Sequence, residues 1–98
     1  MALLHALRSP GDILLEIGGR ARDLRLHKNL SRSSLAEMSG VSTSTIKRFE
    51  ETGVISLSNL VLLAVPLDAT GQLSALFEKP APVSLKELKA PKRERGRL

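Results

Sequence analysis

With 98 residues, 42% of them apolar, the chain has room for one domain with an ordinary hydrophobic core. Only 2% of the residues are aromatic, so that core must be built from Leu, Val, Ile and Ala, which favours a compact helical domain over a β-sandwich. The absence of cysteine excludes a disulfide framework and a thiolate metal site. No apolar run approaches the roughly 18–20 residues of a membrane span. The short apolar start lacks the basic residues of a signal peptide. We therefore expect a cytoplasmic protein without membrane contact.

The formal net charge of +5 is concentrated at the C-terminal end. Residues 80–98 carry six basic and two acidic side chains, whereas residues 1–79 carry nine basic and eight acidic ones. A nucleic-acid surface on the first 79 residues must therefore be local. We divide the chain into an N-terminal segment at 1–8, a domain at 9–79 and a Pro-containing basic tail at 80–98. The tail has little to bury and is expected to be flexible. It could bind nucleic acid, remain a solvated end, or fold on a partner.

The first predicted helix begins after Ser9, a natural N-cap, with Pro10 at its first position and Asp12 in its first turn. It is expected to end near Lys28. One face of this helix is apolar at helical spacing, through Leu14, Ile17, Ala21 and Leu24. The two glycines at 18–19 reduce helix propensity. They indicate either close packing against a neighbouring helix or a kink.

Residues 30–51 are the most informative stretch of the sequence. They predict two helices, over 32–39 and 43–51, each preceded by a serine N-cap, with Gly40 supplying the positive φ of the turn between them. The inward residues are apolar, namely Leu35, Ala36, Val41, Ile46 and Phe49. The second helix turns a small, polar and basic face outward, namely Thr43, Ser44, Lys47 and Arg48. Such a face suits a groove of DNA.

Two further helices are predicted after this stretch. One covers residues 57–65, with Ser56 as its N-cap and Pro66 ending it, and the other covers residues 70–77. The residues expected to face inward are Leu57, Leu60, Leu63, Ala64, Leu73 and Leu76. Five helices joined by short loops predict an all-α fold dominated by local contacts.

Residues 17–25 (IGGRARDLR) and 30–50 (LSRSSLAEMSGVSTSTIKRFE) resemble the Cro/lambda-repressor (XRE-type) helix-turn-helix regulators. The likeness covers residues 12–77, and its most specific part is residues 35–50. It implies a five-helix, lambda-repressor-like DNA-binding domain. The second helix of the motif would enter the major groove and the first would cross the DNA backbone, usually in a dimer.

The resemblance also implies roles for individual residues. The positions at which the family reads bases or nearby phosphates are Ser42, Thr43, Ser44 and Arg48. Arg32 lies where the family usually places a Gln that contacts phosphate, and its charge would strengthen that contact. Arg25 and Glu50 lie where many members have an internal ion pair between the first helix and the reading helix. The alternative is two exposed charges that merely lie near each other. The sequence departs from the family at Ser34, where a Glu commonly completes a capping box.

The chemistry of the outward face supports the same interpretation. Arg48 is the best candidate for direct readout, because its fork matches the guanine edge and is worth about 1–3 kcal/mol of discrimination. Thr43 and Ser44 are short and permit close approach to the DNA, and Thr can also meet a thymine methyl. Lys47 is better suited to a phosphate. The alternative for each of these residues is a solvated helix face.

The expected function is a sequence-specific transcriptional repressor that binds an inverted-repeat operator as a homodimer. A narrower resemblance, carried by the tail sequence PAPVSLKEL, is to the antitoxins of Hip-type kinase toxin pairs, and it implies a kinase toxin as a second partner. The alternative is a protein-interaction adaptor with this fold, which would need apolar anchors on the outward face. We expect neither an enzyme nor a cofactor, since no nucleophile and base or paired carboxylates converge. The isolated His5 and His27 do not indicate a metal site.

Two surfaces are candidates for the dimer contact. One is the last predicted helix, around residues 73–77. The other is the apolar face formed by Leu3, Leu4 and Leu7, whose alternative is a loosely docked terminus.

Overall fold

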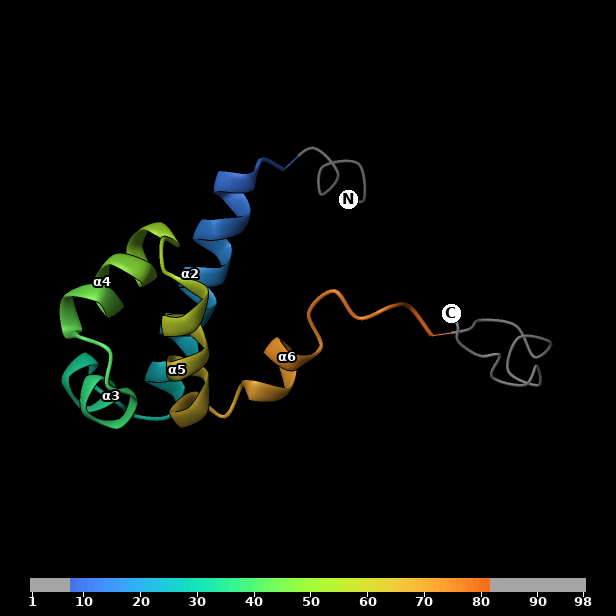
Figure 1. Cartoon of the computed structure of the whole chain (residues 1–98). Coiled ribbons are helices and arrows are strands. Elements are labelled where there is room, and N and C mark those ends of the chain that lie inside the picture. Colours follow the sequence, from blue (N-terminus) through green and yellow to red (C-terminus); the bar gives the residue numbers. More distant parts are fainter. Residues whose placement is uncertain (1–7, 82–98) are drawn as a thin grey trace.

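The computed structural model describes residues 8–81, which form five helices and no strand (Figure 1). The helices are α2 (Pro10–His27), α3 (Arg32–Ser39), α4 (Thr43–Thr52), α5 (Leu57–Leu67) and α6 (Thr70–Ser74). The prediction of an all-α, five-helix domain is confirmed over this part of the chain. The leucine face of residues 3–7 and the basic tail from residue 82 onward lie outside the described residues.

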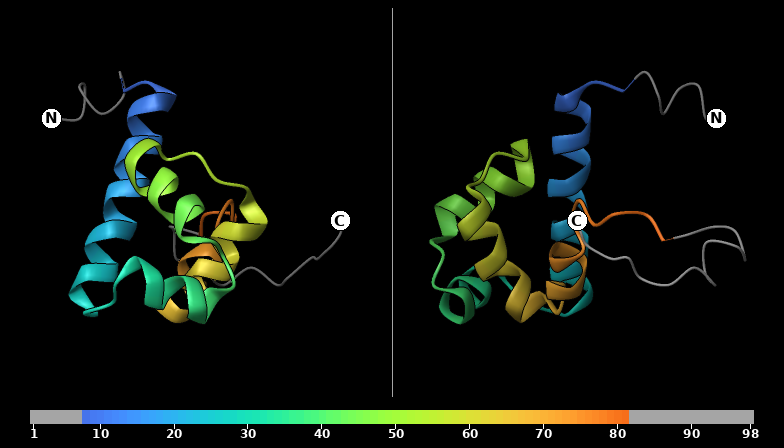
Figure 2. Two further views of the ribbon diagram at one scale, coloured as in Figure 1. Left: turned by 90° about the vertical axis from the view of Figure 1, so that its left-hand side faces the viewer. Right: turned by 45° about the vertical axis from the view of Figure 1, so that its right-hand side comes forward.

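The helices are arranged around the pair α3 and α4. Helix α2 packs against α4, α4 against α3, and α3 against α5. Helix α6 contacts α5 and lies on the other side of it from α3 and α4, as two viewing directions show (Figures 1 and 2). The outer sides of α3 and α4 are therefore left open.

Serine side chains begin four of the five helices. In each case the hydroxyl oxygen accepts a hydrogen bond from a backbone N–H in the first turn, as the predicted caps Ser9, Ser31, Ser42 and Ser56 show. Ser9 forms a full capping box, because the Asp12 carboxylate also accepts from the Ser9 N–H at 3.2 Å. These caps fix where each helix starts.

The hydrophobic core lies between α3, α4 and α5. It consists of Leu35, Val41, Ile46, Phe49, Leu63 and Leu67. Phe49 and Ile46 are fully buried, and burying side chains of this size contributes about 1.5–3 kcal/mol each. The apolar residues of the predicted turn and reading helix therefore form half of the core.

Gly18 lets α2 approach the C-terminal end of α4 closely. A Cβ atom on Gly18 would lie 2.3 Å from the Phe49 carbonyl oxygen, whereas one on Gly19 would meet nothing within 4 Å. Gly53, just after α4, has φ of +80° and would place a Cβ atom 2.2 Å from the Leu14 carbonyl oxygen. Helix α2 continues through both glycines, so the close-packing interpretation is correct for Gly18.

Helix α5 ends later than predicted. It runs to Leu67 with Pro66 inside it, so the expected stop at Val65 is wrong. A proline in the last turn removes only one hydrogen bond, and the helix ends instead at Asp68, whose φ is +61°. The inward position predicted for Leu57 is also wrong, because this residue of the first turn is 66% exposed.

Helix α6 is shorter than predicted. It ends at Ser74 rather than residue 77, has no side-chain cap at Ala69, and buries no residue. Leu73 is partly buried, but Leu76 is 53% exposed and Phe77 is fully exposed with φ of +62°, so the predicted burial of Leu76 is wrong. The lack of a side-chain cap weakens the start of this helix and is consistent with its short length.

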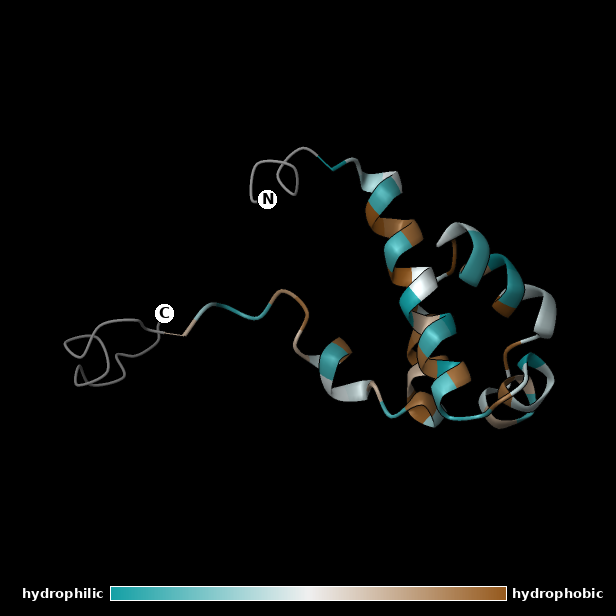
Figure 3. Cartoon of the chain, turned by 180° about the vertical axis from the view of Figure 1, so that it is seen from behind, coloured by the Kyte–Doolittle hydropathy of each residue, from teal (hydrophilic) through white to brown (hydrophobic). Residues whose placement is uncertain are grey.

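Apolar residues are also exposed along α2 and α5. Figure 3 shows hydrophobic and hydrophilic positions alternating along α2. Among the described residues, no single helix is long and apolar enough to span a membrane. Only α4 and α5 together, bent by 98°, would pass on length and composition.

Candidate nucleic-acid interface

The outward face of α4 is polar and basic. Its exposed side chains are Thr43, Ser44, Lys47 and Arg48, while Ile46 and Phe49 of the same helix are buried. Within residues 8–81, neither Lys47 nor Arg48 takes part in an ion pair. Both cations are therefore available to an anionic ligand.

Ser42 has a structural task at the start of this face. Its hydroxyl oxygen accepts from the Thr45 N–H at 3.2 Å and donates to Thr45 Oγ1 at 2.9 Å. The Ser44 hydroxyl lies 3.2 Å from the same oxygen. The structure thus brings Ser42 and Ser44 together and uses the Ser42 hydroxyl as a helix cap, a use that competes with a contact to DNA.

The turn between α3 and α4 is fixed by three local features. Gly40 has φ of +79° and open space around it, so its backbone conformation rather than crowding selects glycine. Its N–H donates to the Ala36 carbonyl at 2.8 Å, and the Val41 N–H donates to Ser39 Oγ at 3.1 Å. Val41 is buried, which anchors the turn in the core. The angle between α3 and α4 is therefore set by the sequence of this turn.

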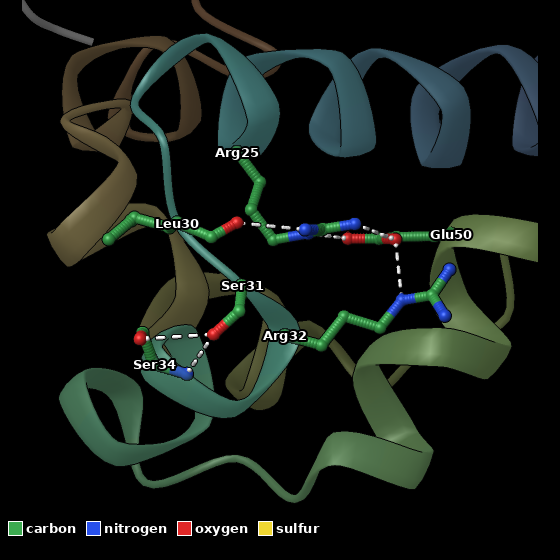
Figure 4. A network of polar contacts seen from close by, with 6 residues as sticks. All are labelled: Arg25, Leu30, Ser31, Arg32, Ser34 and Glu50. Atoms are coloured by element: carbon green, nitrogen blue, oxygen red, sulfur yellow. Dashed lines mark hydrogen bonds and ion pairs between the residues drawn. The ribbon is translucent and has the colours of Figure 1, made fainter.

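Arg25 of α2 and Glu50 of α4 form a buried, two-pronged ion pair (Figure 4). The Arg25 Nε donates to Glu50 Oε2 at 2.7 Å and its Nη2 donates to Oε1 at 3.0 Å. The remaining Nη1 donates to the Leu30 carbonyl at 2.9 Å, just before α3. The side chains are only 7% and 1% exposed, so the alternative of two exposed charges does not apply. One guanidinium thereby connects α2, the start of the motif and α4.

Arg32 of α3 joins the same carboxylate. Its Nε donates to Glu50 Oε1 at 3.0 Å, and its side chain remains 31% exposed. The sequence predicted only a phosphate contact for Arg32, and its hydrogen bond to Glu50 was not predicted. A pair 18 residues apart leaves no periodic signal, and the family position usually holds a neutral Gln, so nothing in the sequence pointed to it.

A model of the helix-turn-helix family matches residues 22–73, just over half of the chain. The chain belongs to this family. The matched region includes α3, the turn at Gly40, α4 and α5, and it agrees with the resemblance to XRE-type regulators. No curated protein matches the chain significantly. The protein is therefore a DNA-binding helix-turn-helix regulator.

In this helix-turn-helix protein, the ion network of Arg25, Arg32 and Glu50 favours the charged form of the carboxylate. Burial alone would raise the pKa of Glu50, but hydrogen bonds and charge from Arg25 and Arg32 outweigh it and hold that pKa below its usual value. The hydrogen bond to Glu50 raises the pKa of Arg25 against the opposing effect of burial. Two guanidinium groups facing one carboxylate leave this network with one net positive charge.

The described residues of this helix-turn-helix protein form an apolar groove but no metal-binding cluster. Within residues 8–81 no group of three His, Cys, Asp or Glu side chains is placed to hold a metal ion. An apolar groove of about 350 Å³ lies between α2, α5 and α6, and its walls include Ile17, Leu60 and Leu73.

Proposed function

We propose that this regulator binds an inverted-repeat operator as a homodimer and represses transcription in the cytoplasm. Helix α4 would enter the major groove of double-stranded DNA, and α3 would cross the backbone. The residues that would contact DNA are Arg32, Ser42, Thr43, Ser44, Lys47 and Arg48. Membership of the helix-turn-helix family supports DNA as the ligand. The geometry of α4 supports its outward residues as the contacts.

One observation carries the proposal: the outward face of α4 has no apolar residue and holds two cations that form no ion pair within residues 8–81, while Ile46 and Phe49 on its inward face are buried. Arg48 can read a guanine edge through its fork, and Lys47 can meet a phosphate as a point charge. The short Thr43 and Ser44 let the helix lie close to the bases. A protein-interaction adaptor would need apolar anchors on this face, so that alternative is not favoured.

The small charge excess of residues 1–79 leads to a prediction for the salt dependence of DNA binding. Nine basic and eight acidic residues give the domain little general attraction to DNA. Binding must therefore depend on a few local contacts, and each phosphate contact that is lost should reduce the slope of log K against log salt by about 0.9.

The decisive experiment is electrophoretic binding to the DNA upstream of the protein's own gene. Arg48→Ala should weaken binding about 5- to 150-fold, because a bidentate contact to a base is worth about 1–3 kcal/mol. Arg22→Ala is the matched control, since Arg22 is exposed on α2 and lies before the motif. Equal binding by wild type, Arg48→Ala and Arg32→Ala would show that the reading face is misassigned.

The homodimer would use the α6 side of the molecule. Leu76 and Phe77 are exposed there, beside the groove between α2, α5 and α6. Pairing through this side would leave α4 open, because α6 lies on the other side of α5 (Figure 1). The two reading helices would then have to meet half-sites about 34 Å apart, one turn of DNA.

The finer assignment as the antitoxin of a Hip-type kinase toxin pair rests on the tail, outside the described residues. It predicts that a kinase encoded by a neighbouring gene co-purifies with this protein. A gene without such a neighbour would remove the basis for that assignment and leave the repressor proposal intact.

A further inference from the structure

Glu50 accepts hydrogen bonds from two arginines although one would balance its charge. Arg25 already occupies both carboxylate oxygens, at 2.7 and 3.0 Å. Arg32 adds a third bond, from its Nε to Oε1 at 3.0 Å. The carboxylate is 1% exposed, so it is a fixed, buried anchor rather than a mobile surface acid. Arg25 alone therefore balances the charge of Glu50, and the positive charge of Arg32 is additional.

Both arginines donate to the carboxylate through Nε, but their terminal amino groups are used differently (Figure 4). Arg25 uses all its nitrogen atoms inside the protein and is 7% exposed. Arg32 uses only Nε, and its two terminal amino groups, at the far end of the guanidinium, make no hydrogen bond within residues 8–81. At 31% exposure, this outer edge is accessible at the first position of α3.

We propose that Glu50 is a positioning residue for the DNA backbone: it holds Arg32 by Nε so that the two terminal amino groups grip one phosphate. The inference rests on the proposed function, in which α3 crosses the backbone. A guanidinium binds phosphate through two parallel N–H groups, and these remain available while Nε is held. Fixing this long side chain before DNA arrives removes the entropy loss that a mobile arginine would suffer on binding.

The opposite arrangement makes the opposite prediction. If Arg32 had to leave Glu50 to reach DNA, the carboxylate would compete with the phosphate, and removing its charge would strengthen binding. In the proposed arrangement the carboxylate and the phosphate use different nitrogen atoms. Removing the charge of Glu50 then weakens binding, and it does so only while Arg32 is present.

The test is a double-mutant cycle with Arg32→Gln and Glu50→Gln, read as affinity for the operator duplex found upstream of the protein's own gene, between 50 and 200 mM salt. Arg32→Gln should weaken binding about tenfold at low salt and reduce the salt slope by about 0.9. Glu50→Gln should weaken binding several-fold in the wild-type background and have little effect in the Arg32→Gln background. Equal effects in both backgrounds, or tighter binding by Glu50→Gln, would overturn the proposal.

Arg32→Lys is the conservative control. It retains the charge and should restore the salt slope, because counterion release depends on charge. It lacks the fork that joins Nε to two outer amino groups, so its affinity should stay below that of wild type. Full recovery of affinity by Lys would contradict the positioning role.

Glu50→Gln leaves Arg25 buried without a counter-charge and can unfold the domain, so a measurement on the wild-type protein stands beside it. In arginine side-chain NMR spectra of the free protein, the Nε proton of Arg32 should exchange with water more slowly than that of the exposed Arg48. In the DNA complex the Arg32 Nε proton should stay protected, and its terminal amino protons should become protected. An unprotected Arg32 Nε proton in the free protein would overturn the proposal.

The two proposals fail in different ways. A wild-type protein that does not bind the duplex at 50 mM salt would overturn the proposed function and this inference with it. Binding by wild type that is unchanged in Arg32→Gln would overturn this inference alone.

Discussion

Glu50 shows how a single side chain can serve both the fold and the site. Its carboxylate lies in the core beside Phe49, where an unpaired charge would be costly, and two guanidinium groups compensate it. The pKa of Glu50 is lowered by these partners, so the charged form is stabilised by folding.

This shift predicts a pH dependence of stability. The stabilisation from charged Glu50 is fully present above the unfolded-state pKa of about 4.3 and is lost as pH falls through the lower folded-state pKa. Arg25, whose pKa is raised, stays charged throughout this range. At pH 7, Glu50→Gln should lower the free energy of unfolding by about 3–5 kcal/mol, as for a broken buried pair. Urea unfolding followed by far-ultraviolet circular dichroism should show this difference shrinking toward pH 3. A difference that is constant with pH would contradict the assignment.

The sequence anticipated part of this residue-scale detail. The positions of Arg25 and Glu50 in the family pattern implied their pairing, and the ion pair is present. The bond from Arg32 could not be foreseen, because it depends on how α3 and α4 cross and not on any spacing along one helix. The roles of the α4 side chains toward DNA remain predictions of the sequence and the geometry together.

At the scale of the helices, starts were predicted better than ends. Serine caps act through local hydrogen bonds, so the sequence reveals them directly. The end of α5 depends on the positive φ of Asp68, and α6 ends at Ser74 without such a residue at its C-cap, so neither end had a clear signal in the sequence. The close contact at Gly18 was predicted only in part. The glycine pair indicated close packing against a neighbouring helix but did not identify which glycine makes the contact.

The two neighbouring glycines of α2 provide a matched test of that contact. Gly18→Ala should destabilise the domain by about 1–3 kcal/mol, because its Cβ atom would collide with the Phe49 backbone at 2.3 Å. Gly19→Ala has open space and should stabilise the helix by about 0.5–1 kcal/mol. Thermal unfolding by circular dichroism measures both. Similar shifts for the two variants would mean that α2 and α4 do not meet as described.

At the scale of the whole molecule, exposed apolar residues lie along α2 and α5 and also just after α6. Phe77, one of two aromatic residues in the chain, is fully exposed there, next to Leu76. The sequence predicted Leu73 and Leu76 as buried and also offered residues 73–77 as a candidate dimer contact. The five residues of α6 are too few to form an independent helix, which explains why Leu76 is not packed.

The proposed homodimer gives this surface a test. Phe77→Asp should leave the stability of the monomer unchanged, since the side chain is fully exposed. It should weaken dimerisation about 100-fold or more, because each copy would lose about 1.5–3 kcal/mol of burial. Sedimentation equilibrium measures the association. Met38→Asp, a change at an exposed residue of α3, is the control. An unchanged dimerisation constant would exclude the α6 side as the contact.

The joining of α2 to α4 also has a consequence for the speed of folding. The Arg25–Glu50 ion pair spans 25 residues of chain, and the Gly18 contact with Phe49 closes a longer stretch that overlaps it. Loop closure over such a distance has only a modest entropic cost, and helical domains built from short-range contacts fold in microseconds to milliseconds. We expect a domain that assembles around the α2–α4 contact on this timescale. Newly synthesised protein would then be ready to find DNA almost as soon as the chain is released.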